Sequence, residues 1–247
     1  MDSMLLTPLP VADVFYAFRE STLAGKAIVA LLFAGSILAW SIMVTKGMDL
    51  SRAMRESARF LDLFRKESHP VSLYVKKKVF ANSPLFTIYE MGCLAIGREL
   101  ERGEFPDRDE LLHHGMGAPV GQLSRLQMEA IRNLAERNVA SQALQMENNM
   151  GVLATAVTSA PFLGLLGTVW GVMDGFAGMA EQGSANLSAV APGISAALLT
   201  TVVGLLVALP SAIGYNLLTN KIRVLTVQMD NFAQEFDSEV RRVYFKD

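Results

Sequence analysis

The sequence predicts an all-α integral membrane protein with three transmembrane helices. Of its 247 residues, 51% are apolar, and its mean hydropathy is positive. The charged residues leave three long uncharged runs, Ala27–Val44, Asn148–Met173 and Gln182–Asn220. Each run can supply the roughly 20 residues that cross a hydrocarbon core of about 30 Å. Elsewhere apolar residues recur at helical spacing, and no strand pattern or internal repeat stands out.

Residues 1–24 are predicted to form an N-terminal segment, and residues 25–45 the first transmembrane helix. An apolar run near the N-terminus can also be a cleaved secretory signal. Here the preceding leader is long and mostly uncharged or acidic, and no A-x-A cleavage pattern follows the run. We therefore expect the first run to remain as a membrane anchor.

The orientation of the chain follows from its 22 basic residues. Fifteen lie between Lys46 and Arg137, none lies between Arg137 and Lys221, and five lie in the tail. Lysine and arginine near the ends of a span resist translocation. We therefore expect residues 1–24 and the loop 175–190 outside, and residues 46–149 and 217–247 in the cytoplasm.

The long region 46–149 has a soluble composition and is predicted to be helical. Pro70 and Pro84 should break its helices. The expected helices are Asp49–Lys66, Val71–Arg102 and Val120–Glu147, with a linker at Gly103–Pro119. The last of these runs towards the second transmembrane helix, residues 150–174. We expect the second and third membrane helices to be prolonged into the cytoplasm.

The second transmembrane helix carries a stripe of glycines. At 100° per residue, these glycines share an arc of about 80°: Gly164, Gly167, Gly171, Gly175 and Gly178. Small residues let helix backbones approach closely in a bilayer. The stripe is therefore predicted to pack against another helix, with Thr168 beside it.

The third transmembrane helix, residues 191–216, repeats this design. Its small face spans about 80° and consists of Gly193, Ala197, Thr200, Gly204, Ala208 and Ser211. Pro192 suits a helix start, and Pro210 is expected to bend the helix near its cytoplasmic end. The two small faces should pack together, with Thr168 and Thr201 at similar depths. A membrane threonine often only bonds its own i−4 carbonyl, so a structural role for both stays open.

The histidines, the lysine cluster and the single cysteine do not form a pattern that indicates an enzyme. His113 and His114 point about 100° apart on a helix and His69 is distant in sequence, so we expect no metal site. Lys76–Lys78 could touch lipid headgroups, but a solvated helix face is favoured. The single cysteine, Cys93, is expected to be a buried cytoplasmic thiol. Without a phosphate-binding loop or nucleophile elbow, we predict no catalytic activity, no cofactor and no nucleic-acid partner.

Two blocks carry a resemblance to a known family. The segments GLLGTVWGVM and VAPGISAALLTTVVGLLVALPSAIGYN resemble the signature of the TolQ/ExbB/MotA proton-channel family, and SILAWSIMVTK is similar too. The tail MDNFAQEF resembles the TolQ branch more than the ExbB branch. The resemblance implies a subunit of the bacterial inner membrane, with its outer segments in the periplasm, that couples proton flow to mechanical work.

The same resemblance implies roles and partners. Thr168 and Thr201 would line a pore beside an aspartate from a single-span partner similar to TolR or ExbD. Geometry alone favours Thr200 as the more central residue. A ring of copies, pentameric by resemblance, would surround the partner and act on a transducer similar to TolA or TonB, within membrane lipid. Many members have glutamate where this chain has Ala196, so an acid there cannot be essential here.

Three alternatives stay open. A membrane scaffold without an ion path would share the same packing stripes. A permease would need a polar site or broken helices near the midplane, and the spans show neither. Within the family, a role like that of ExbB in outer-membrane nutrient uptake stands beside a TolQ-like role in envelope maintenance, and sodium could replace protons.

Overall fold

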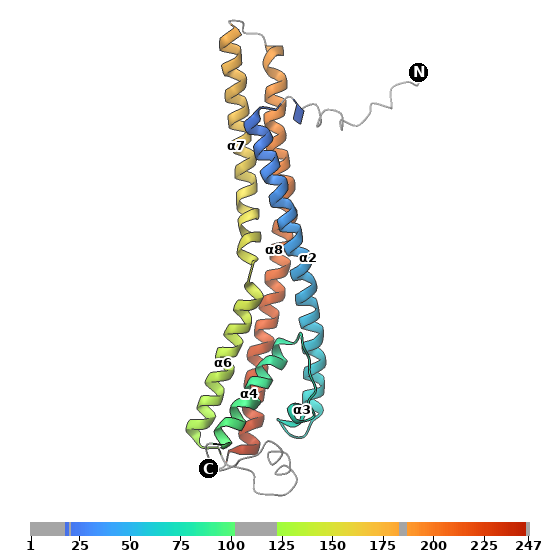
Figure 1. The fold of residues 1–247 in the computed structure, drawn as a ribbon, viewed down its shortest axis with the longest axis vertical. Coiled ribbons are helices and arrows are strands. Elements are labelled where there is room, and N and C mark those ends of the chain that lie inside the picture. The colour runs from blue at the N-terminus through green and yellow to red at the C-terminus, as the bar shows by residue number, and fades with distance from the viewer. Residues whose placement is uncertain (1–17, 20, 102–122, 183–186, 246–247) are drawn as a thin grey trace, which may run out of the picture. The chain divides into compact units, whose positions relative to one another are not determined.

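The computed structural model describes residues 18–19, 21–101, 123–182 and 187–245, and within these ranges it contains helices and no strand (Figure 1). The helices of eight or more residues are α2 (Leu23–Lys66), α4 (Pro84–Glu101), α6 (Arg125–Glu147), α7 (Met150–Gln182) and α8 (Leu187–Tyr244). One short helix, α3, covers Ser72–Val75. The linker predicted at Gly103–Pro119 lies outside the described residues, as does most of the predicted N-terminal segment.

The chain divides into two compact units. We name them by the placement that the sequence predicts: residues 1–44 and 149–217 form the membrane unit, and residues 45–148 and 218–247 form the extramembrane unit. Three helices, α2, α7 and α8, are long and apolar enough to cross a membrane. The predicted all-α architecture with three membrane-spanning helices is therefore confirmed.

Helix boundaries differ in part from those expected. Helix α2 runs without interruption for 44 residues, so the predicted helix at Asp49–Lys66 is the continuation of the first span. Gly47 alone between them costs only about 1 kcal/mol of helix propensity, which does not break a helix. Helices α6 and α7 are separated at Asn148 and Asn149, where Asn149 has a φ of 66°. Asparagine adopts this left-handed conformation more readily than most residues.

The third span and its extension form one helix of 58 residues, α8. Pro192, which we expected at a helix start, lies inside α8 because the helix begins at Leu187. The segment before Pro84 holds only the single turn α3, whereas we expected helix from Val71 onwards. Pro84 itself occupies the first position of α4, where a missing N–H costs nothing.

An aromatic core holds the extramembrane unit together. Rings from α2, α4 and α8 meet at centroid distances of 5.2–5.7 Å, with Phe60 and Phe64 each contacting both Tyr89 and Phe232. All four side chains are buried. Gly92 is required beside them, because a Cβ there would collide with the ring of Phe236. Burial raises the pKa of the Tyr89 phenol, whose oxygen accepts a hydrogen bond from the N–H of Tyr74 at 3.0 Å.

Candidate functional site

In the membrane unit, α7 and α8 touch backbone to backbone. A Cβ placed on Gly204 would lie 2.6 Å from the carbonyl oxygen of Ala160 and 3.1 Å from Cα of Gly164. A Cβ on Gly164 would lie 2.9 Å from the carbonyl oxygen of Thr200. Real Cβ atoms do not fit at such distances from backbone, so both positions depend on the absence of a side chain.

The contact continues along the helix pair. A Cβ on Gly167 would collide with the side chain of Thr200, and one on Gly171 would lie 2.7 Å from Cβ of Ala197. Gly167, Gly171, Ala197 and Thr200 are all buried. Four of the small residues selected from the sequence therefore meet at one interface between α7 and α8.

Towards the outer end the contact loosens. A Cβ on Gly175 would lie 3.1 Å from Cγ1 of Val190, and one on Gly193 would lie 4.0 Å from Cα of Gly175. A Cβ on Gly178 would have no neighbour within 4 Å. Pro210 is half-buried within α8. Close packing in the described structure thus centres on Gly164, Gly167 and Gly171.

Thr168 and Thr201 form a hydroxyl pair across this interface. Their Oγ1 atoms are 2.6 Å apart, and both side chains are half-buried. Thr168 Oγ1 lies 3.0 Å from the carbonyl oxygen of Ala197 on α8, and Thr201 Oγ1 lies 3.1 Å from the carbonyl oxygen of Gly164 on α7. The structure therefore brings together the two hydroxyls that the family resemblance selected.

The hydroxyl pair has two alternative hydrogen-bond arrangements, because each hydroxyl carries one hydrogen. In the first, Thr168 donates to Thr201, and Thr201 donates to the carbonyl of Gly164. In the second, Thr201 donates to Thr168, and Thr168 donates to the carbonyl of Ala197. No heavy atom moves between them. A chain of this kind can pass a proton in principle, although neither threonine titrates near neutral pH.

Thr200 has a different environment. Its side chain is only 1% exposed, and its Oγ1 lies 2.7 Å from the carbonyl oxygen of Ala197 and 2.9 Å from that of Gly164. Its methyl and hydroxyl groups fill the space that Gly167 leaves open. Thr200 therefore fastens α8 to α7, and it is less accessible than the Thr168–Thr201 pair.

The carbonyls of Gly164 and Ala197 are the parts of this site that sequence reasoning missed. The Gly164 carbonyl oxygen has the hydroxyls of Thr200, Thr201 and Thr168 within 2.9, 3.1 and 3.3 Å. It can receive them because glycine at position 164 lets α8 approach. A carbonyl gives no signal in a sequence, but the glycine that exposes it does.

The hydroxyl pair lies within two runs, Asn148–Met173 and Gln182–Asn220, that contain no acidic or basic residue. The nearest along α7 is Asp174, six residues beyond Thr168, or about 9 Å along the helix axis at 1.5 Å per residue. Ala196, at the position where relatives were expected to carry glutamate, is 2% exposed. The described part of this chain thus offers hydroxyls and carbonyls at the site and no carboxylate.

The residues set aside earlier lie elsewhere. Cys93 is buried in the extramembrane core, and burial raises its pKa. Lys76 pairs with Glu67 at 2.6 Å, while Lys77 and Lys78 are exposed. His69 packs edge-on against Tyr244, and His113 and His114 lie outside the described residues. In the described ranges, no group of three or more acidic, histidine or cysteine side chains could hold a metal ion.

Comparison with known proteins shows the family of this chain. Residues 107–231 match the MotA/TolQ/ExbB proton channel family. The Tol-Pal system protein TolQ of Haemophilus influenzae is 27% identical over 230 residues, covering 92% of this chain and 93% of that protein. The biopolymer transport protein ExbB of Salmonella typhimurium is 46% identical over 214 residues, covering 85% of this chain and 79% of that protein.

A second ExbB protein, from Neisseria meningitidis, is 29% identical over 228 residues, covering 92% of this chain and 95% of that protein. The matches extend across both membrane blocks and most of the remaining chain. Together with the three apolar helices, they establish that this chain belongs to the MotA/TolQ/ExbB proton channel family, as a multi-pass bacterial membrane protein of the TolQ/ExbB type.

Proposed function

We propose that this protein is the channel-forming subunit of an inner-membrane complex driven by the proton-motive force, in which protons pass the Thr168–Thr201 pair. The observation that carries this proposal is the 2.6 Å contact between two hydroxyls from different membrane helices. The pair connects the carbonyls of Ala197 and Gly164, and it can reverse its hydrogen-bond direction without moving either helix.

A proton carrier at mid-membrane needs a group that titrates, and threonine does not supply one. The carboxylate would come from a single-span partner similar to TolR or ExbD, whose aspartate would face Thr168 and Thr201. The hydroxyls would then solvate this carboxylate as it gains and loses a proton. Copies of the chain would assemble as a ring, pentameric by family resemblance, around the partner.

The energy for work would come from each transferred proton, about 2.3 kcal/mol per 100 mV of membrane potential. The ring would convert it into rotation or sliding of the partner, and a transducer similar to TolA would carry the motion onward. The TolQ-like form of this function, which maintains the cell envelope, is supported by the tail MDNFAQEF and by a TolQ match that spans 93% of that relative.

The test is proton uptake by vesicles that contain the chain co-purified with its single-span partner. Replacing Thr168 and Thr201 together by valine keeps the side-chain shape and removes both hydroxyls. A buried polar group that loses its partner costs about 1–3 kcal/mol, so we expect proton flux to fall by roughly 5- to 150-fold. Oligomer size and partner binding, measured in parallel, should stay unchanged.

Thr158→Val is the matched control. Thr158 lies on the same helix, and its hydroxyl bonds only to carbonyls of α7, at Ala154 and Thr155. Thr158→Val should leave proton flux at the level of the unsubstituted protein. Undiminished flux in the double variant contradicts the pore role, while loss of assembly in it identifies the hydroxyls as structural and favours a scaffold. Replacing the proton gradient by a sodium gradient in the same vesicles identifies the ion.

A second candidate function is an ExbB-like role that energises outer-membrane transport with a transducer similar to TonB. The 46% identity to an ExbB protein favours it. Identifying the co-purified partner and testing which loss the chain restores, envelope integrity or TonB-dependent uptake, separates the two roles.

A further inference from the structure

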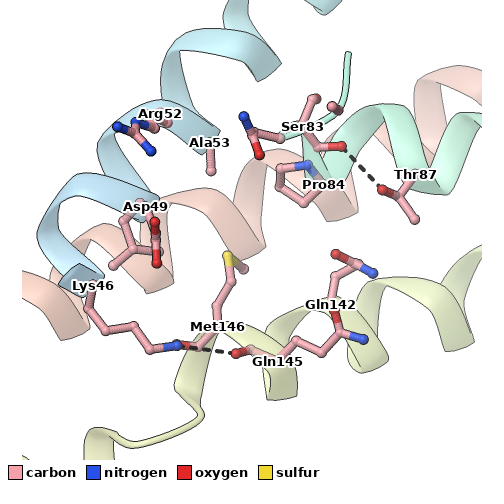
Figure 2. Close-up of a pocket in the computed structure, with 13 residues that line it drawn as sticks. Lys46, Asp49, Arg52, Ala53, Ser83, Pro84, Thr87, Gln142, Gln145 and Met146 are labelled. Carbon is pink, nitrogen blue, oxygen red and sulfur yellow. Dashed lines mark hydrogen bonds between the residues drawn. The ribbon is translucent and has the colours of Figure 1, made fainter. Parts of the chain in front are cut away.

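The extramembrane unit contains a pocket of about 310 Å³ that the channel function does not use. It lies between α2, the start of α4 and the end of α6 (Figure 2). Its polar rim includes Lys46, Asp49, Arg52, Asn82, Gln142 and Gln145, and its apolar surface includes Leu50, Ala53, Pro84 and Met146.

The chain enters the membrane beside this pocket. Lys46 is the first charged residue after the apolar run that ends at Val44, and Met146 stands two residues before the run that begins at Asn148. From Lys46 to Arg52, α2 rises about 9 Å at 1.5 Å per residue. The headgroup layer is about 5–7 Å thick on each side of a bilayer. The Lys46 end of the pocket is therefore expected within the headgroup layer, and Arg52 at or just beyond its outer edge.

Two cations of α2, about 120° apart around the helix, line the rim. The Lys46 ammonium donates to the carbonyl oxygens of Gln145 at 3.4 Å and Met146 at 3.2 Å. An ammonium has three hydrogens, so one stays available. Arg52 is exposed, and among the described residues it forms no hydrogen bond or ion pair. Its guanidinium can bind two oxygens of one phosphate.

The remaining groups of the pocket indicate which class of phosphate ligand fits it. Asp49 leaves the rim with two positive charges and one negative, which suits a singly charged phosphodiester better than a dianion. The apolar surface under the rim can contact the carbon atoms next to a phosphate, which a free phosphate lacks. Ser83 shapes this part of the pocket, because its hydroxyl bonds Ser57 at 3.1 Å and the N–H of Phe86 at 3.1 Å.

From these contacts we propose that the pocket binds the phosphodiester headgroup of an anionic membrane phospholipid. Lys46 and Arg52 hold the phosphate, and the surface formed by Ala53, Pro84 and Met146 contacts the glycerol. The bound lipid joins α2, α4 and α6 where the chain leaves the bilayer. The lysine cluster at Lys76–Lys78 is a weaker candidate, because Lys76 is already paired with Glu67.

The test is lipid binding to the full chain in detergent, measured by native mass spectrometry while short-chain phosphatidylglycerol is added. The double variant Lys46→Gln, Arg52→Gln should bind at least about tenfold more weakly, as expected for the loss of a charge-assisted hydrogen bond. Arg55→Gln is the matched control, since Arg55 is an exposed cation of α2 outside the pocket. It should change binding by less than about twofold.

Ala53→Leu fills the pocket and keeps every charge, so it covers the case in which the double variant misfolds. It should also weaken binding about tenfold, because the lipid would have to displace the new side chain. Unchanged binding in Ala53→Leu, or equal loss in Arg55→Gln, overturns the proposal in favour of general charge attraction.

Two further ligands identify the source of the phosphate. Phosphatidylcholine should bind more weakly than phosphatidylglycerol, and inorganic phosphate at millimolar concentration should not displace the lipid. Equal binding of both lipids overturns the role of the two cations. Displacement by inorganic phosphate overturns the lipid assignment and identifies a site for free anions.

Discussion

Gly164 of α7 and Gly204 of α8 bring two membrane helices into backbone contact, with a Cβ on Gly204 coming within 3.1 Å of Cα of Gly164. The Thr168–Thr201 pair depends on this approach, because Thr201 Oγ1 reaches the Gly164 carbonyl across the same gap at 3.1 Å. Close packing and the polar site are therefore one feature of the structure.

Gly204→Ala should destabilise the membrane unit. The new methyl group would meet the Ala160 carbonyl oxygen at 2.6 Å and force the helices apart, at a cost of about 1–3 kcal/mol. Gly178→Ala is the opposite case, since its Cβ would meet nothing within 4 Å. It should be neutral or stabilising by up to about 1 kcal/mol. Thermal unfolding in detergent measures both, and equal effects would contradict the contact.

Gly171→Leu should break assembly and not merely conduction. Leucine would project into Ala197, whose Cβ lies 2.7 Å from the position of a Cβ on Gly171. Separation of the backbones would lose contacts along the whole stripe. Native gel or size-exclusion analysis in mild detergent measures the oligomer, and a variant with native size and normal activity would show that the stripe does not pack.

Thr200→Val should lower stability more than conduction. The Thr200 hydroxyl is buried and bonds the Ala197 and Gly164 carbonyls at 2.7 and 2.9 Å. Its removal should cost about 1 kcal/mol of unfolding free energy, whereas proton flux per assembled complex should change little. The comparison with Thr201→Val is direct, because the residues are adjacent. A larger flux loss in Thr200→Val would reverse their assignments.

Ala196→Ser should be tolerated. Ala196 is 2% exposed, and a serine hydroxyl on a membrane helix can bond the carbonyl four residues earlier at little cost. Oligomer size and proton flux should match those of the unsubstituted protein. A severe defect would show that this position does more than pack.

Acidification should destabilise the extramembrane unit through His69. Burial lowers the pKa of this imidazole, so between the folded value and about 6.5 the unfolded chain binds more protons and stability rises with pH. Unfolding temperatures at about pH 7.5 and 5.5 should therefore differ less in His69→Gln than in the unsubstituted protein. An equal difference in both would assign the pH dependence to other groups.

The proposed topology can be tested by cysteine labelling in intact cells. Cys93 is the chain's single cysteine and is buried, so it should react little. An impermeant maleimide should label Ala180→Cys, because the short loop beyond it has no basic residue, and it should not label Glu90→Cys or Gln234→Cys. All three positions are helical, and labelling of Ala180→Cys and Glu90→Cys from one side would exclude three spans.

Sequence reasoning recovered the helices because uncharged runs and 3.6-residue periodicity depend on local chemistry. It missed the continuity of α2, because the first span was predicted to end before the charged Lys46, although a charged residue does not end a helix. Periodicity placed Thr200 on the small face, and the family resemblance selected Thr201, but neither gave the distance between the helices. That distance separates a buried anchor, Thr200, from a hydroxyl paired across the interface, Thr201.

The pocket between α2, α4 and α6 could not be predicted from the sequence. Its walls come from α2, α4 and α6, which are brought together by the aromatic core around Phe60 and Tyr89. Each lining residue alone resembles an ordinary surface residue. Only the folded arrangement brings Lys46 and Arg52 to the rim of one pocket.

The reversible hydroxyl pair has a kinetic consequence for the proposed channel. A proton that hops through Thr168 and Thr201 leaves both hydroxyls in the opposite arrangement from the one it met. The next proton in the same direction cannot enter until both hydroxyl hydrogens have turned back about their Cβ–Oγ1 bonds. Transfer and reorientation must therefore alternate, so the pair admits protons singly, and the slower of the two steps sets its maximum throughput.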